Sequence, residues 1–171
     1  MKDIRVISLA SKVWDQGVLG IVCSRLVEKY HKPVFLFSQV GNELHGSGRS
    51  IDDINIHEIL SSLKDILETY GGHSMAAGLT LKREKYEEFT KRVNSFVFEK
   101  VDDKVFIPIS YYDQDITLEE INDEFYKNLQ VLEPVGCGNP RPKFKITASD
   151  IEINPMKRFP QHANIKIGDL E

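Results

Sequence analysis

The chain has 171 residues, of which 41% are hydrophobic and 28% charged, and its net charge is −4. This is enough for one full domain with a substantial core plus a smaller part, and the negative charge argues against a general DNA-binding protein. With only two cysteines, no apolar run near the roughly 20 residues that span a bilayer and no signal-peptide pattern, we expect a cytoplasmic protein without disulfides or membrane contact.

The first hundred residues predict an α/β domain with a mixed β-sheet flanked by helices. Strands are expected where apolar, β-branched runs occur, and helices where apolar residues recur at helical spacing. The predicted elements, in chain order, are a strand over 4–10, a helix over 17–30, a strand over 33–38, a short hairpin strand over 44–47, a helix over 56–67, a strand over 77–81 and a helix over 86–97. We assign the aromatic stripe of the last helix to the core rather than to a base-stacking surface.

The remaining residues predict a second, smaller domain. A strand is expected over 106–112 and a capped helix over 117–130, after which the segment Pro134–Pro142 breaks every periodic pattern. We therefore divide the chain into domains of residues 1–133 and 134–171. Alternating apolar and polar residues predict strands over 143–153 and 163–167 in the second domain, too few to complete a barrel.

Two glycine-rich segments predict a binding site for an anion. Gly71 and Gly72 precede His73, and glycines in a loop can turn their N–H groups toward a phosphate while a histidine donates beside them. The alternative is an ordinary tight turn. The presence of a second such segment in one small domain favours a shared phosphate ligand.

The second segment runs from Gly46 to Ser50. It combines the hydroxyls of Ser47 and Ser50 with the guanidinium of Arg49, whose planar fork matches a phosphate group, and Gly48 lies between them. The alternative here is a loop that carries a solvated arginine. We expect both glycine-rich segments to form loops around one ligand.

The motifs together resemble a known family. The segment Trp14–Arg25 (sequence WDQGVLGIVCSR), Lys32-Pro33-Val34, the Gly46–Ser50 segment and the Gly71–Gly78 segment follow one another as in the C-terminal half of the RecJ family of DHH phosphoesterases, which are single-strand-specific 5′→3′ DNA exonucleases. The segment Leu132–Pro140 resembles the passage from the DHH-associated domain into an oligonucleotide-binding (OB) domain. The resemblance covers nearly the whole chain.

The resemblance implies that this chain and a separate catalytic domain act together in DNA repair and recombination. Members of the superfamily hold catalytic Mn²⁺ or Mg²⁺ in an N-terminal domain with an Asp-His-His signature, which this sequence lacks, and its histidines show no metal-ligand spacing. The chain is thus expected to hold no cofactor and to be inactive alone. It would bind single-stranded DNA, preferably at a 5′ end, for that catalytic domain, and other repair proteins are further expected partners.

The resemblance also implies roles for individual residues. Arg49, Ser47, Ser50, Gly48, Gly71, Gly72 and His73 would bind the terminal phosphate, and His73 would either bind it or neutralise charge in the transition state. Arg25 and Trp14 rank lower, because a pairing role for Arg25 and a packing role for Trp14 fit as well. Asp15 and Cys23 depart from the family pattern, in which histidine and alanine are common.

Two other functions remain open at this point. One is the substrate domain of an oligoribonuclease or cyclic-dinucleotide phosphodiesterase of the same superfamily, although the Leu-Glu-Pro linker and the following strands argue against it. The other is a non-catalytic adaptor that uses the fold to bind a repair partner. The adaptor reading predicts that Arg49→Ala and His73→Ala leave partner binding intact.

Overall fold

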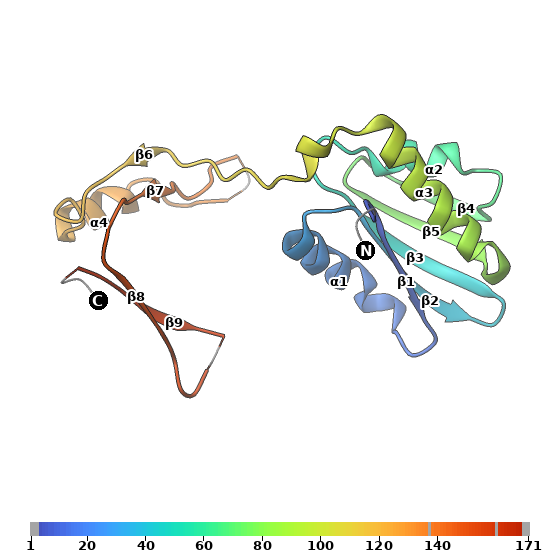
Figure 1. Cartoon of the computed structure of the whole chain (residues 1–171), viewed down its shortest axis with the longest axis horizontal. Coiled ribbons are helices and arrows are strands. Elements are labelled where there is room, and N and C mark those ends of the chain that lie inside the picture. Colours follow the sequence, from blue (N-terminus) through green and yellow to red (C-terminus); the bar gives the residue numbers. More distant parts are fainter. Residues whose placement is uncertain (1–3, 137, 160, 169–171) are drawn as a thin grey trace. The chain divides into compact units, whose positions relative to one another are not determined.

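The structure, a computed structural model, describes residues 4–136, 138–159 and 161–168. It divides into two compact units, residues 1–108 and residues 109–171 (Figure 1). Cys137, which we assign to a loop, and the chain start at Met1 lie outside the described residues. No helix in the described part of the chain is long and apolar enough to cross a membrane.

The first unit is built on a five-stranded sheet. Its strands are β1 (Ile7–Ser11), β2 (Val34–Val40), β3 (Glu43–Arg49), β4 (Thr69–Gly72) and β5 (Ala76–Lys82), in the spatial order β1-β2-β3-β5-β4. Strands β1 and β2 are parallel, and the other neighbours are antiparallel. The predicted mixed sheet is thereby confirmed.

Helices cover the two faces of this sheet (Figure 1). Helix α1 (Gln16–Tyr30) packs against one face, while α2 (Ile56–Ser62) and α3 (Tyr86–Lys100) pack against the other. Strand β2 shows why, because its first four residues are apolar and alternate between the faces: Val34 and Leu36 meet α1, whereas Phe35 and Phe37 meet α3. Helix α1 begins where the Asp15 carboxylate accepts the Gly17 N–H.

The main core lies between the sheet and the helix pair. The Phe89 ring stands edge-on to Phe35 and Phe37, at centroid distances of 5.2 and 5.4 Å. Phe89, Val93 and Val97 of α3 are fully buried. The aromatic stripe of this helix therefore forms core, as predicted.

The second unit contains less regular structure. Its elements are β6 (Gln114–Asp115), α4 (Asp123–Gln130), β7 (Phe144–Lys145), β8 (Ile151–Pro155) and β9 (Ala163–Ile167). Strand β6 pairs with β7 in parallel, and β8 pairs with β9 in antiparallel orientation. Two short 3₁₀ helices, η1 (Arg83–Lys85) and η2 (Asp103–Phe106), precede it in the first unit.

Three features of this region differ from the prediction. The strand expected over 106–112 does not form, since η2 occupies its start and residues 107–113 are irregular. Helix α4 begins at Asp123 instead of near 117, because Asn122 caps it by accepting the Phe125 N–H. The strand expected over 143–153 is divided into β7 and β8.

The domain boundary also lies elsewhere. Residues 113–116 hydrogen-bond to residues 143–145 on the far side of the predicted boundary after Glu133, as in the Asp113 N–H bond to the Lys143 carbonyl (2.8 Å). The Phe125 ring packs on the Phe144 ring, with 5.1 Å between the two ring centroids. Helix α4 thus belongs with the following strands, and the structure separates its units after Pro108.

Candidate nucleic-acid interface

The Gly46–Ser50 segment is a central strand and not a loop. Residues up to Arg49 form β3, which pairs with β2 on one side and β5 on the other. A Cβ atom on Gly46 would lie 2.5 Å from Cε1 of Phe37, and one on Gly48 would lie 2.7 Å from Cε1 of Phe35. These two glycines therefore make room for core aromatics, which corrects the phosphate-binding role predicted for Gly48.

Ser47 and Arg49 project from the other face of β3, toward α1. Both are half-buried. Arg49 Nη1 donates to the Gly48 carbonyl (2.8 Å) and lies 3.3 Å from Ser47 Oγ. Arg49 forms no ion pair with any other residue that the structure describes. A half-buried guanidinium without a counter-ion, next to a hydroxyl, is suited to an anionic ligand.

A row of residues without bulky side chains continues from Ser47 across the sheet. Ser47 is paired with Gly78 of β5, which is paired with Gly71 of β4. A Cβ on Gly71 would meet nothing within 4 Å, and one on Gly78 would meet only the Gly46 carbonyl oxygen at 4.0 Å. Both glycines are exposed, so this glycine strip (Ser47, Gly78, Gly71) is an open backbone surface.

The predicted Gly71-Gly72 nest does not form. Both glycines belong to β4, which pairs with β5, so they lie in a strand and not in a loop that turns both N–H groups toward one phosphate. Gly72 is needed for a different reason: its φ is +142° and a Cβ there would lie 2.3 Å from the Ala76 carbonyl oxygen. It permits the close turn into the connection that follows.

His73 begins the three-residue connection between β4 and β5. Its N–H donates to the Ala76 carbonyl (2.8 Å), and Ala76 is paired with Arg49. His73 is exposed, and two strand spacings, about 10 Å, separate its backbone from that of Arg49. The fold therefore brings Ser47, Arg49, Gly71 and His73 to one end of three neighbouring strands.

Ser50 fixes this end of the sheet instead of facing a ligand. Its side chain is buried and donates to the Ile54 carbonyl (2.6 Å), which corrects the predicted phosphate role. The Ser50 N–H donates to the Met75 carbonyl (3.0 Å), and the Ile56 N–H donates to the Ser74 carbonyl (2.9 Å). The residues after β3 thus hold the connection that contains His73.

The two lower-ranked residues lie apart from this cluster. Trp14 precedes α1, packs against the small cluster of Leu19 and Leu36, and accepts the Ser38 hydroxyl at its carbonyl (2.6 Å). Arg25 is exposed on α1 and pairs with Glu28 at 3.5 Å. Packing and ion pairing account for these side chains without a ligand.

Sequence reasoning missed two residues of α1 that contact the cluster. A Cβ on Gly20 would lie 2.9 Å from Arg49 Nη2, and the Cys23 thiol donates to the Ser47 carbonyl (3.1 Å). Burial raises the pKa of the Cys23 thiol to about 11, while a hydrogen bond with the Leu36 backbone and the Arg49 charge act in the opposite direction. A glycine inside an otherwise regular helix was the available signal.

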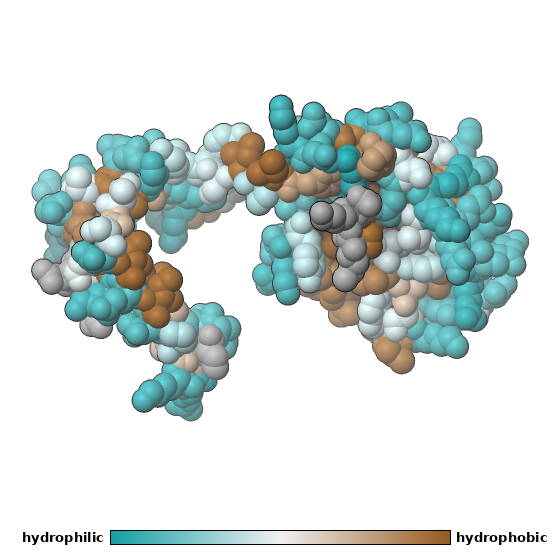
Figure 2. Space-filling view, viewed as in Figure 1, coloured by the Kyte–Doolittle hydropathy of each residue, from teal (hydrophilic) through white to brown (hydrophobic). Residues whose placement is uncertain are grey.

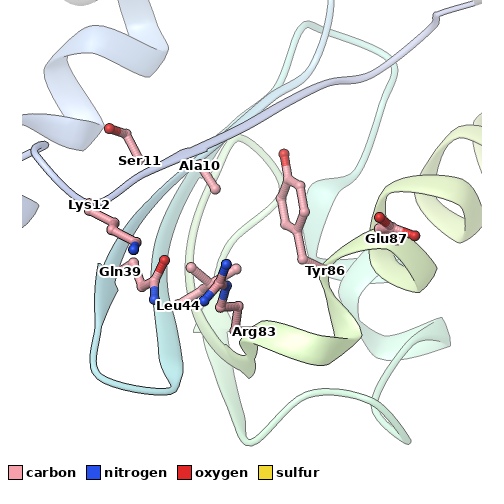
Figure 3. Close-up of a pocket in the computed structure, with 8 residues that line it drawn as sticks. All are labelled: Ala10, Ser11, Lys12, Gln39, Leu44, Arg83, Tyr86 and Glu87. Carbon is pink, nitrogen blue, oxygen red and sulfur yellow. The ribbon is translucent and has the colours of Figure 1, made fainter.

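A separate pocket of about 390 Å³ lies at the opposite end of β3 (Figure 3). Lys12 and Arg83 approach it from different elements, and the Tyr86 ring forms a wall. None of the residues predicted for phosphate binding lines it. No group of three or more potential metal ligands occurs among the residues that the structure describes.

Comparison with known proteins identifies both units. The family model of the DHHA1 domain matches residues 3–99, and that of the RecJ OB domain matches residues 112–170. The single-stranded-DNA-specific exonucleases RecJ of Bacillus subtilis and Thermus thermophilus are 34% and 32% identical to the chain over 88% and 90% of its length. The chain spans about a fifth of these relatives, 19% and 22%.

Solved structures agree with this assignment. The crystal structure of RecJ in complex with Mn²⁺ from Thermus thermophilus superposes with a TM-score of 0.82, at 28% identity, over 97% of this chain and 24% of that chain. A complex with Mg²⁺ from the same organism gives a TM-score of 0.78. The presence of an OB domain after the DHHA1 domain also argues against the alternative that the chain is the substrate domain of an oligoribonuclease or cyclic-dinucleotide phosphodiesterase. The chain therefore belongs to the RecJ family, of which it contains the DHHA1 and OB domains.

Proposed function

We propose that this chain binds single-stranded DNA for a RecJ-type exonuclease and that Ser47 and Arg49 hold the terminal phosphate of the strand. The observation that supports this most directly is the half-buried Arg49 guanidinium, which lies beside the Ser47 hydroxyl and has no counter-ion among the described residues. A phosphate would satisfy both donors and compensate the buried charge.

The glycine strip provides the adjoining surface. Because Gly71 and Gly78 have no side chains, the nucleotide that carries the phosphate can lie flat on β4 and β5 while its phosphate meets Arg49. His73, at the same end of the sheet, would add a further donor to the phosphate or to the charge that develops on it. The proposal therefore includes two roles for His73, binding of the phosphate and stabilisation of the charge in the transition state.

Phosphodiester hydrolysis is assigned to another part of the protein. Mn²⁺ or Mg²⁺, held by a DHH catalytic domain, would activate water, while this chain positions the strand. We propose that this work belongs to DNA repair and recombination in the cytoplasm, with preference for 5′ ends. The chain alone is expected to leave a labelled single strand intact in the presence of Mn²⁺, and cleavage that copurifies with the folded chain would contradict this division.

The proposal is tested by fluorescence anisotropy with a short single-stranded oligonucleotide that carries either a 5′-phosphate or a 5′-hydroxyl. We expect the phosphate to tighten binding and Arg49→Ala to remove most of that gain, roughly tenfold in Kd, with little change for the hydroxyl form. A salt series reports the number of phosphate contacts.

Arg83→Ala is the charge-matched control, since Arg83 lies in the pocket at the opposite end of β3. It should leave the gain from the phosphate unchanged. If both variants lose the same part of the affinity gained from the phosphate, only the net charge of the chain matters for binding. If the phosphate gives no gain in the wild-type chain, end recognition by Ser47 and Arg49 is wrong, and a 3′-phosphate oligonucleotide tests the polarity in the same way.

A further inference from the structure

Helix α1 contains a glycine where helix stability favours another residue. Gly20 is the fifth residue of the helix, within its regular part. Glycine in a helix interior is less favourable than alanine, so a local reason for it is required. Apolar packing does not supply one, because the closest neighbours of a Cβ at this position would be polar atoms of β3.

Those neighbours are the two residues that we assign to the phosphate. A Cβ on Gly20 would lie 2.9 Å from Arg49 Nη2, 3.6 Å from Arg49 Cζ and 3.4 Å from Ser47 Oγ. Non-bonded carbon and nitrogen atoms are comfortable near 3.5 Å, so the guanidinium would have to move by about half an ångström or more. The guanidinium is the flexible end of its side chain, which makes it the group that moves.

One turn further along α1, Cys23 holds the backbone of the same segment. Its thiol donates to the Ser47 carbonyl at 3.1 Å, and it is completely buried. Helix α1 therefore fixes Ser47 through Cys23 and leaves a space for Arg49 at Gly20. The two contacts lie on one face of the helix, three residues apart.

We propose that Gly20 is a positioning residue, which sets the direction of the Arg49 guanidinium by leaving it room against α1. This inference rests on the proposed phosphate-binding role of Ser47 and Arg49. Bidentate binding of phosphate depends on the orientation of the planar guanidinium, so a displaced group loses affinity even though its charge is retained. Gly20 thus contributes to binding without touching the ligand.

The test compares Gly20→Ala with Gly17→Ala in the full chain. Gly17 lies in the first turn of the same helix, and a Cβ there would meet only the Asp15 carboxylate, at 3.1 Å. Three quantities are measured: the melting temperature, the Arg49 guanidinium Nε–H resonance, and the ratio of Kd values for the 5′-hydroxyl and 5′-phosphate oligonucleotides.

Gly20→Ala should raise the melting temperature by roughly 3–5 °C, because alanine favours the helix and the obstructed group can swing away. It should shift the Arg49 resonance and reduce the Kd ratio by about two- to fivefold, less than Arg49→Ala does, because the charge is retained. Gly17→Ala should change neither the resonance nor the ratio. A helix that merely became more stable would leave the ratio constant.

The outcomes separate this inference from the proposed function. If Arg49→Ala lowers the ratio and Gly20→Ala does not, Gly20 has no positioning role and phosphate binding by Arg49 stands. If the wild-type ratio is one, the proposed function fails and the positioning role in phosphate binding falls with it. An Arg49 resonance that is unchanged in Gly20→Ala overturns the steric argument whatever the oligonucleotide data show.

Discussion

At the scale of single residues, the glycines of this chain serve different purposes although they share one identity. Gly46 and Gly48 leave space for two phenylalanine rings, Gly72 adopts a backbone conformation that other residues avoid, and Gly71 leaves a surface open. Composition cannot separate these cases, because each depends on what lies opposite the missing Cβ.

Gly46 of β3 and Gly71 of β4 should therefore respond differently to the same substitution. Gly46→Ala places a methyl group 2.5 Å from the Phe37 ring and should lower the free energy of unfolding by about 1–3 kcal/mol. Gly71→Ala meets no atom within 4 Å and should change it by less than about 0.5 kcal/mol. Urea unfolding of the two variants measures the difference, and equal effects would contradict the packing shown for β3.

Cys23 gives a second prediction at this scale. Because burial raises its pKa to about 11, the thiol is protonated at neutral pH and should not react with Ellman's reagent until the first unit unfolds. The measurement uses a Cys137→Ser background, so that Cys23 is the reporting thiol. Rapid labelling of the native protein at pH 8 would show that the thiol is accessible.

The same pKa sets a pH dependence with a definite sign. The native thiol holds its proton above the ordinary pKa of 9.0, so the native state binds more protons than the unfolded state between pH 9 and about 11. The stability due to Cys23 is thus complete below pH 9 and is lost as the pH rises toward 11. Cys23→Ala should flatten this part of the stability curve.

At the scale of elements, α3 fastens the beginning of the chain to the sheet. The Asn94 Oδ1 atom accepts the N–H groups of Arg5 and Val6, each at 2.9 Å, and its Nδ2 donates to the Val6 carbonyl at 3.2 Å. At the start of the helix, the Tyr86 hydroxyl donates to the Ser8 carbonyl. Polar side chains of α3 thereby bind backbone groups of β1 and of the residues just before it. They do so at the edge of the sheet, where β1 has no neighbouring strand.

Removal of the Asn94 side chain should weaken the attachment of β1 to α3. Asn94→Ala leaves two part-buried backbone N–H groups without their acceptor and is expected to cost about 1–3 kcal/mol of unfolding free energy. Ser95→Ala is the control, since Ser95 is an exposed neighbour on the same helix. Thermal unfolding measures both, and hydrogen exchange should show faster exchange at Val6 in the Asn94 variant alone.

At the scale of the whole molecule, the two units differ in how much apolar surface they bury. The first unit contains a core of seventeen buried residues, whereas Ile116 is the one buried apolar residue among those described in the second unit. Ile151, Ile153 and Ile165 of β8 and β9 are more than half exposed, and Figure 2 shows apolar side chains on the surface of this unit. Burial of apolar surface is the main stabilising contribution to folding.

The second unit should accordingly open at a lower free energy than the first. In hydrogen exchange on the full chain, the amides of β8 and β9 are expected to exchange at least about a hundredfold faster than those of β2 and β3. Single-stranded DNA that contacts the second unit should slow this exchange. Equal protection in the two units without DNA would contradict the difference in burial.

The sequence by itself determined most elements of the first unit and led to the prediction of an anionic ligand, although it did not predict β4 and extended α2 beyond Ser62. Helix α1 and strands β1 and β2 follow from apolar periodicity, which depends on nearby residues alone, and the Ser-Gly-Arg pattern pointed to an anion. It also identified the family through motifs that remain together in sequence order.

Only the tertiary structure decided which residues meet. It withdrew Ser50 and Gly48 from the site, placed Gly71 and Gly72 in a strand, added Gly20 and Cys23, and moved the boundary between units to Pro108. Apart from the local hydrogen bond between Ser50 and Ile54, these outcomes depend on contacts between different segments: β2 with β3, β4 with β5, α1 with β3, and β6 with β7. A glycine in a strand looks like a glycine in a loop until the opposite strand or ring is known, because its role is set by the space around it.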